Sequence, residues 1–130
     1  MCQRILIVDD DVSITNYLKL ELEENLPELE IICENKGYLA LNVIMSDGID
    51  LLLTDIAMPD MDGYELYSRT KEFDENLPVI MMTGFGYDPD HIVVKSKQAG
   101  LHDVIFKPFD IKKLTKMIKD RIKRRLIRSS

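Results

Sequence analysis

The sequence lacks the features that mark membrane-spanning, disulfide-bonded and low-complexity proteins. Its longest apolar runs are far shorter than a transmembrane helix requires, so we expect no membrane span. Its two cysteines, Cys2 and Cys33, have no CxxC spacing, which indicates buried or idle thiols in a reducing cytoplasm. It shows no internal repeat or interdomain linker, and its first predicted strand begins at Arg4, so we expect no signal peptide.

The composition is that of one globular domain. The 130 residues are 45% hydrophobic and 31% charged, a balance that supports a buried core. We therefore expect a single domain spanning residues 1–130, with its core at about residues 3–120. Residues 121–130 form a basic stretch, which we interpret as an extension of the last helix or the start of a linker.

The net charge of −6 is unevenly distributed along the chain. From Lys107 onward, ten basic residues stand against two acidic ones, a net charge of +8, which leaves −14 on residues 1–106. An acidic body gives no reason to expect direct nucleic-acid binding. The basic C-terminal stretch is typical of a solvated helix face, and an acidic partner, a membrane surface or nucleic acid are the alternatives for it.

Apolar segments of strand length alternate with segments of helical periodicity. The third apolar segment, 51–54, is the most apolar, as expected for a central parallel strand buried on both faces. Because crossovers between parallel strands are right-handed, the pattern predicts an α/β fold of the (βα)5 type, a doubly wound three-layer sandwich with a parallel five-stranded sheet. We expect its strands in the flavodoxin-like order 2-1-3-4-5. The expected strands are 4–8, 30–34, 51–54, 79–82 and 104–106, and the expected helices begin near Asp11 or Ser13, Gly37, Tyr64, His91 and Ile111.

Four predicted strands end on polar side chains that suit phosphoryl transfer. Asp9 and Asp10 follow the first strand, and Asp55 follows the third. Thr83 follows the fourth strand and Lys107 the fifth. Because the carboxyl ends of parallel strands lie at one edge of a sheet, where ligands bind beside the switch in strand order, we expect these side chains to converge.

The chemistry of these residue types favours metal-assisted transfer to a carboxylate. Three carboxylates close together repel one another unless a cation joins them, and oxygen ligands of this kind suit Mg²⁺. In this interpretation Asp55 is the nucleophile and Thr83 binds the transferred group, while Lys107 and the metal ion neutralise developing charge.

Four segments carry these residues: 8–11 (VDDD), 54–63 (TDIAMPDMDG), 78–84 (PVIMMTG) and 106–109 (FKPF). They resemble the motifs of response-regulator receiver domains in two-component signalling, and the resemblance covers nearly the whole chain. It implies that Asp55 accepts a phosphoryl group from the phosphohistidine of a sensor histidine kinase or a histidine phosphotransfer protein. It also implies that Thr83 and Lys107 contact this group. Mg²⁺ would be held by Asp10, Asp55 and the backbone carbonyl of Ala57, with Asp9 acting mostly through metal-bound water.

The resemblance further implies a phosphorylation-controlled switch in the cytoplasm and not an enzyme in the ordinary sense. Phosphorylation is expected to change the face formed by the helix after Thr83, the fifth strand and the last helix. A downstream output domain or protein would read that face, and a phosphorylation-dependent dimer would form through it. The family's usual cis peptide bond is expected at Lys107–Pro108.

The chain departs from the family pattern in two respects, which concern how phosphorylation changes the surface and how long the phosphorylated state lasts. Val104 stands where many receivers have an aromatic residue, and we expect the nearby Phe106 to point to the opposite face of the sheet. The connection after the fourth strand is longer than usual, and Phe85 or Tyr87 within it is a candidate for the moving aromatic. Ala57 and Phe85 flank the phosphoryl position without a group to orient water, which predicts a long-lived phosphoaspartate.

Two other classes of protein share parts of this pattern. Haloacid-dehalogenase-type phosphatases use an aspartate nucleophile after the first strand in a DxD pattern, which Asp9 and Asp11 match superficially. Such enzymes need a further acidic motif after the lysine, where this chain offers only Asp110. Mapping the phosphorylated residue, Asp9 or Asp55, separates the two classes. A flavin-binding module needs a loop rich in Ser, Thr and Gly after the first strand, where three aspartates stand instead.

Overall fold

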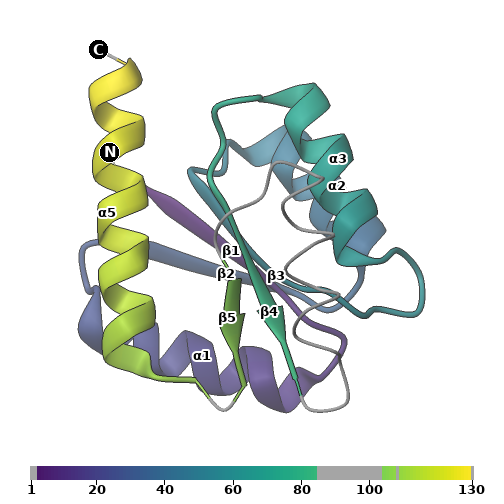
Figure 1. The fold of residues 1–130 in the computed structure, drawn as a ribbon, viewed down its shortest axis with the longest axis horizontal. Helices are drawn as coiled ribbons and strands as arrows, with labels where there is room; N and C mark the ends of the chain where they lie inside the picture. Colours follow the sequence, from purple (N-terminus) through teal and green to yellow (C-terminus); the bar gives the residue numbers. More distant parts are fainter. Residues whose placement is uncertain (1–2, 85–103, 108, 130) are drawn as a thin grey trace.

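The computed structural model describes residues 3–84, 104–107 and 109–129. Strands alternate with helices over residues 4–83, as the apolar pattern predicts, and one further strand and helix follow from residue 104 (Figure 1). None of the described helices is long and apolar enough to cross a membrane. The strands are β1 (Arg4–Val8), β2 (Glu30–Glu34), β3 (Leu51–Asp55), β4 (Val79–Thr83) and β5 (Val104–Phe106), and the helices are α1 (Val12–Asn25), α2 (Gly37–Asp47), α3 (Gly63–Phe73) and α5 (Ile111–Ser129).

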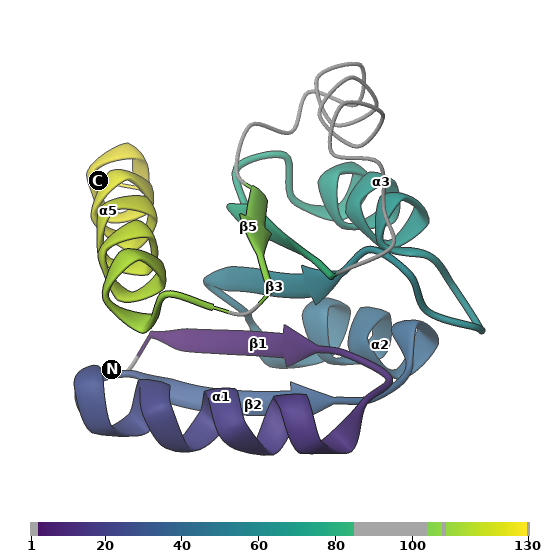
Figure 2. The same ribbon diagram turned by 60° about the horizontal axis from the view of Figure 1, so that its bottom comes forward.

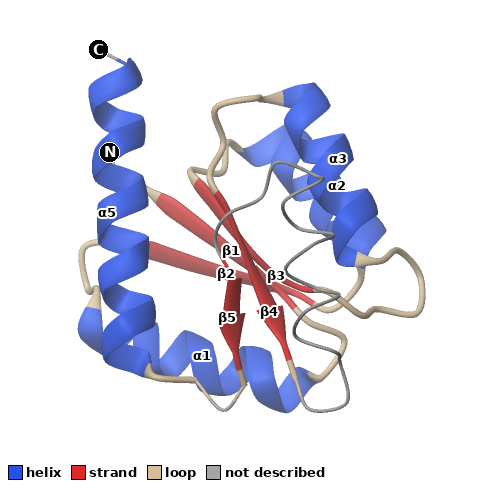
Figure 3. Ribbon diagram, viewed as in Figure 1, coloured by secondary structure: helices blue, strands red, loops and turns tan. Residues whose placement is uncertain are grey.

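The five strands form one parallel sheet in the order β2-β1-β3-β4-β5, which confirms the predicted topology (Figure 3). β1 pairs on both sides, with Ile5 opposite Ile31 of β2 and opposite Leu51 of β3. β3 and β4 each continue one residue beyond the predicted end, and Asp55 lies opposite Met82 in this part of the ladder. The strand order reverses between β1 and β3, so the ligand-binding position of this fold lies where these two strands end.

Helices lie on both faces of the sheet (Figures 1 and 2), and apolar side chains are buried on both faces. Along β1, Ile5 and Ile7 pack in a core with α1 and α5, whereas Leu6 and Val8 pack in a core with α2 and α3. All five residues of β3 are buried, as predicted for the central strand. Each fully buried aliphatic side chain contributes about 1.5–3 kcal/mol, so the two cores hold the strand ends in fixed positions.

α1 and α3 each begin after an aspartate whose side chain binds an otherwise unpaired backbone N–H group. Asp11 is the N-cap of α1, and its carboxylate accepts a hydrogen bond from the Ser13 N–H at 3.0 Å. Asp62 caps α3 in the same way at 2.8 Å, so this helix begins at Gly63, one residue before the predicted start. At the other end of α2, Gly48 has a φ of 69°, a left-handed conformation that glycine adopts without strain.

α5 packs on the sheet through the apolar stripe that its sequence predicts. Leu114, Ile118 and Ile122 are buried in the core shared with α1, and Ile111 packs against the same core. The helix continues through the basic stretch to Ser129.

Arg125 ties this extension to the body of the domain. Its guanidinium lies 2.9 Å from a carboxylate oxygen of Asp74, after α3, and 3.6 Å from one of Asp50, before β3. The Arg125 side chain is 18% exposed, so these pairs are better shielded from water than ordinary surface pairs. α5 therefore remains docked beyond its last buried isoleucine.

One expectation about β5 is wrong. Residues two apart in a strand share a face, so Phe106 lies on the same side as Val104, and Ile105 between them belongs to the opposite core. Val104 packs against the core of α2 and α3, while Phe106 is 46% exposed. Other expectations concern features outside the described residues, namely the helix predicted from His91, the aromatic residues Phe85 and Tyr87, the Lys107–Pro108 peptide bond and Cys2.

Candidate functional site

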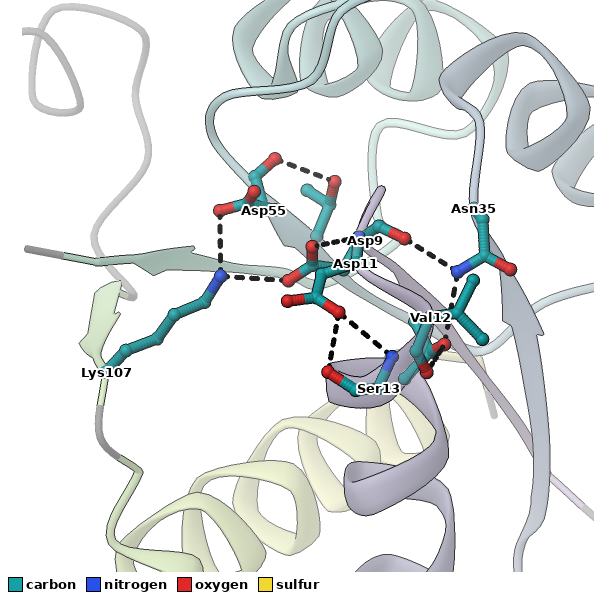
Figure 4. Close-up of polar contacts among 9 residues, drawn as sticks. Asp9, Asp11, Val12, Ser13, Asn35, Asp55 and Lys107 are labelled. Atoms are coloured by element: carbon teal, nitrogen blue, oxygen red, sulfur yellow. Dashed lines mark hydrogen bonds and ion pairs between the residues drawn. The ribbon is translucent and has the colours of Figure 1, made fainter.

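The polar residues at the strand ends lie together at the carboxyl edge of the sheet (Figure 4). Asp9 directly follows β1, Asp55 is the last residue of β3, and Lys107 directly follows β5. The Lys107 ammonium lies 2.9 Å from Asp9 Oδ2 and 3.5 Å from Asp55 Oδ1, across separations of 98 and 52 residues in the chain. Thr83 ends β4 at the same edge, and its carbonyl oxygen accepts a hydrogen bond from the Lys107 N–H at 2.7 Å.

Asp10 adds a third carboxylate to those of Asp9 and Asp55. One oxygen from each of the three lies within 4.8 Å of the other two. Asp9 and Asp55 are buried, whereas Asp10 is exposed. Such an all-oxygen donor set fits a hard divalent cation such as Mg²⁺, which binds one or two carboxylates and keeps several waters. Ala57, the expected carbonyl donor, lies two residues beyond β3 and is exposed.

Burial makes ionisation of the two inner carboxyl groups costly. Burial and the charge of Asp9 raise the pKa of Asp55 to about 6, and the Lys107 ammonium limits the rise. Burial also raises the pKa of Asp9, although hydrogen bonds from the Asp11 N–H and from Lys107 oppose it. Burial disfavours the ammonium form of Lys107, yet its hydrogen bond to Asp9 and the charge of Asp55 outweigh this effect and raise its pKa. Lys107 is therefore the internal counter-ion of a site with excess negative charge.

Asp11 belongs to a helix cap and not to the carboxylate cluster. Its Oδ1 accepts hydrogen bonds from the hydroxyl and the N–H of Ser13, at 2.6 and 3.0 Å, and these bonds hold the pKa of Asp11 below its usual value. Asp110 has a similar role at α5, where it accepts from the Lys113 N–H at 3.2 Å. Asp11, the second aspartate of the DxD pattern, and Asp110 thus both cap helices. This favours the receiver interpretation over the phosphatase interpretation.

The side chain of Thr83 presents a buried hydroxyl at the same edge. The residue is 1% exposed, and its Oγ1 has no hydrogen-bond partner among the described residues. Buried hydroxyls nearly always have a partner, because leaving one unpaired costs about 1–3 kcal/mol. A hydroxyl in this position is suited to bind a ligand oxygen, the role that we expect of Thr83.

Glycine at position 63 allows α3 to begin directly against the end of β3. The Gly63 N–H donates to the Ile56 carbonyl oxygen at 2.7 Å. A Cβ atom on Gly63 would lie 2.5 Å from the carbonyl oxygen of Asp55 and 2.9 Å from Ile56 Cα. Both are backbone atoms that cannot move without displacing Asp55. The turn that carries Asp55 therefore depends on a residue without a side chain.

The sequence interpretation missed two residues that contact the loops of the site. Asn35, after β2, donates from Nδ2 to the Asp9 carbonyl oxygen at 2.8 Å and to Thr15 Oγ1 at 3.1 Å (Figure 4). Asp60, in the loop after β3, accepts from the first two N–H groups of α2 at 3.2 and 3.1 Å. Although burial raises the pKa of Asp60, hydrogen bonds from the backbone hold it below its usual value. Both contacts join distant segments, so no local spacing indicates them.

Comparison with known families and proteins agrees with this geometry. The family model described as a response regulator receiver domain matches residues 5–119. Sporulation initiation phosphotransferase F of Bacillus subtilis (strain 168) is 36% identical over 119 residues, which cover 92% of this chain and 93% of that protein. Regulatory protein AtoC of Escherichia coli (strain K12) is 33% identical over 115 residues, 88% of this chain and 24% of that protein.

Solved structures show the same likeness in three dimensions. A response regulator receiver domain protein (CheY-like) from Methanospirillum hungatei JF-1 matches with a TM-score of 0.87 and 31% identity, over 98% of this chain and 99% of that one. Among the curated relatives, the chain spans nearly all of the phosphotransferase but only about a quarter of AtoC. The matching region is thus almost a whole protein in one relative and a fraction of a longer regulator in the other.

Proposed function

This chain belongs to the response regulator receiver domain family, and from that premise we propose that it is a phosphoacceptor switch phosphorylated on Asp55. The donor is the phosphohistidine of a sensor histidine kinase or of a histidine phosphotransfer protein. One observation carries the proposal: Asp55 lies beside the Lys107 ammonium and two further carboxylates, in a family whose fold brings strand ends together. The Thr83 hydroxyl, without a partner among the described residues, adds support.

The proposed transfer exchanges one bond to phosphorus for another. A carboxylate oxygen of Asp55 attacks phosphorus, the P–N bond to the donor imidazole breaks, and the electron pair of that bond stays on the imidazole nitrogen, which takes a proton from solvent. Because the pKa of Asp55 is about 6, most of this carboxyl is ionised and nucleophilic at neutral pH. Burial keeps the carboxylate poorly hydrated, so little water has to leave before the attack.

Lys107 and Thr83 would stabilise the transferred group. The Lys107 ammonium lies between Asp9 and Asp55, so a small movement lets it follow the negative charge from the carboxylate to a phosphoryl oxygen. The Thr83 hydroxyl would donate to another phosphoryl oxygen, which gives this buried group a partner in the phosphorylated state.

Mg²⁺ is the proposed cofactor. Asp10, Asp55 and the carbonyl of Ala57 would hold it. Both carboxylate oxygens of Asp9 already accept hydrogen bonds, Oδ2 from the Lys107 ammonium and Oδ1 from the Asp11 N–H. Asp9 would therefore act through metal-bound water. When bound, the ion would supply positive charge that offsets the repulsion among the carboxylates and phosphoryl oxygens.

Phosphorylation would then shift an equilibrium between two surface states. β5 connects the site with the surface, because Lys107 directly follows it and Phe106 within it is exposed. A downstream output domain or protein would read the face of β5, α5 and the helix predicted between β4 and β5, and a phosphorylation-dependent dimer would use the same face. The domain would act in the cytoplasm as a switch that assists only its own phosphorylation and dephosphorylation.

Incubation with phosphoramidate, a small donor with a P–N bond, tests the proposal without a cognate kinase. We expect the wild-type protein to gain a phosphoryl group on Asp55 in the presence of Mg²⁺, and Asp55→Asn to gain none. Asp47→Asn, which removes an exposed carboxylate at the end of α2, is the matched control and should be labelled like the wild type. Labelling on Asp9, or undiminished labelling of Asp55→Asn, would overturn the assignment.

A further inference from the structure

The junction between β2 and α2, residues 34–38, contacts both loops that carry the carboxylates of the site. We propose that this junction, together with Asp60 in the loop after β3, positions the carboxylates for phosphoryl transfer, and that Asn35 and Asp60 are the two positioning residues. This inference rests on the proposed function, since it concerns how Asp9 and Asp55 are held for that reaction. Neither Asn35 nor Asp60 is proposed to touch the phosphoryl group or the metal ion.

Asn35 holds the loop after β1. Its Nδ2 donates to the Asp9 carbonyl oxygen at 2.8 Å, and the Asp9 N–H donates to the Glu34 carbonyl oxygen at 3.3 Å. The Asn35 side chain also donates to Thr15 Oγ1 at 3.1 Å, and that hydroxyl donates to the Val12 carbonyl oxygen at 3.0 Å in the first turn of α1 (Figure 4). The backbone of Asp9 is therefore bound to the junction through both its N–H and its carbonyl group.

Asp60 holds the loop after β3 to the same junction. Its two carboxylate oxygens accept from the N–H groups of Gly37 and Tyr38, at 3.2 and 3.1 Å. These N–H groups belong to the first turn of α2, where no intrahelical partner exists, and the N-cap residue Lys36 makes no side-chain cap of its own. The carboxylate also lies at the positive end of the helix dipole, which strengthens the contact.

The two segments also pack directly against each other. A Cβ atom on Gly37 would lie 2.7 Å from Met61 Cβ and 3.2 Å from the Met61 carbonyl oxygen, so only glycine allows this approach without rearrangement. The loop then returns to the end of β3 through the hydrogen bond from the Gly63 N–H to the Ile56 carbonyl oxygen at 2.7 Å. A movement of Asp60 would therefore displace the backbone of Ile56, which directly follows the phosphoacceptor Asp55.

A support of this kind matters because the groups that it holds repel one another. Oxygens of Asp9, Asp10 and Asp55 lie within 4.8 Å, and like charges favour separation of the two loops. Functional groups have to stay within about 0.5 Å of the productive geometry. The junction joins the two loops on the side of β2, at the position where α2 begins, and so opposes their separation.

The affinity for Mg²⁺ in the unphosphorylated protein measures this role directly. Isothermal titration calorimetry of Asn35→Ala and Asp60→Asn should show binding weakened by roughly 10-fold in each, the usual loss when a group that orients metal ligands is removed. The loops after β1 and β3 are connected through the junction, and either substitution breaks this connection. The double variant should therefore bind Mg²⁺ about as weakly as the single variants. Labelling by phosphoramidate at low Mg²⁺ should fall in parallel and recover at saturating Mg²⁺.

Controls separate positioning from stability and from the proposed function. Asn42→Ala and Asp47→Asn change exposed residues of α2 outside the junction and should bind Mg²⁺ like the wild type. Urea unfolding identifies the variants that fold, and Asn35→Ser replaces Asn35→Ala if the latter does not. Folded variants with wild-type Mg²⁺ affinity would overturn the inference. Failure of the wild type to be labelled would defeat the proposed function instead, and the Mg²⁺ titration would still decide whether the junction positions the carboxylates.

Discussion

Replacing Asp55 by asparagine is expected to stabilise the metal-free protein at neutral pH while it abolishes the proposed phosphorylation. Burial, and then the charge of Asp9, raise the pKa of Asp55 from 3.8 to about 6. The native state therefore binds the proton of this carboxyl more tightly than the unfolded chain does. At neutral pH the ionised carboxylate destabilises the folded state, and a neutral amide of the same shape removes that effect.

The magnitude follows from the pKa. A tenfold difference in proton affinity corresponds to about 1.4 kcal/mol. A pKa of about 6 in place of 3.8 therefore means that the ionised Asp55 carboxylate destabilises the folded state by at most about 3 kcal/mol. Lys107 keeps its closer partner, Asp9, at 2.9 Å in the variant. We expect Asp55→Asn to raise the free energy of unfolding by about 1–3 kcal/mol at neutral pH. The gain should shrink as the pH falls through about 6 and vanish below 3.8, where the carboxyl is protonated in both states.

Urea unfolding with a chelator, at about pH 7 and about pH 4, measures this gain for wild type and variant. The two proteins are compared by their free energies of unfolding at the same pH. In this difference, the contributions of other titrating groups cancel if these groups do not interact with Asp55. Adding Mg²⁺ at neutral pH should narrow the difference, because the ion stabilises the wild type more. Equal stability at neutral pH, or a gain independent of pH, would refute the reasoning.

Three further predictions concern other contacts of the site and the last helix. Gly63→Ala places a Cβ atom 2.5 Å from the Asp55 carbonyl oxygen and should lower the free energy of unfolding by about 2–4 kcal/mol in urea unfolding; a change below about 0.5 kcal/mol would show that the turn adapts freely. Arg125→Ala removes the ion pairs with two aspartates of the body, so the last turns of α5 should exchange their amide hydrogens faster, and unchanged exchange would contradict the docking role. Ala57 has no group to orient an attacking water, so the phosphorylated protein should release phosphate more slowly than receivers with Asn or Glu at that position; equally fast release would reject this explanation.

Much of the fold follows from local patterns in the sequence. The bounds of β1, β2 and β5 are the predicted ones, because the apolar residues of each strand mark its place between polar or turn residues. The start of α3 was predicted one residue late, because the capping side chain of Asp62 and not the first apolar residue sets it. The face of Phe106 was predicted wrongly, although the two-residue period of a strand alone assigns it to the side of Val104.

The chemical groups at the strand ends can be identified from the sequence alone, and the parallel sheet that the sequence predicts is sufficient to expect them at one edge. The contacts that the three neighbouring aspartates make depend on the tertiary structure. Asp9 pairs with Lys107, Asp10 joins the exposed side of the cluster, and Asp11 caps α1. The contacts of Asn35 and Asp60 likewise appear only in the folded chain. The physical reason is that strand ends align through a repeating backbone ladder, whereas a loop side chain takes its direction from distant segments that pack against it.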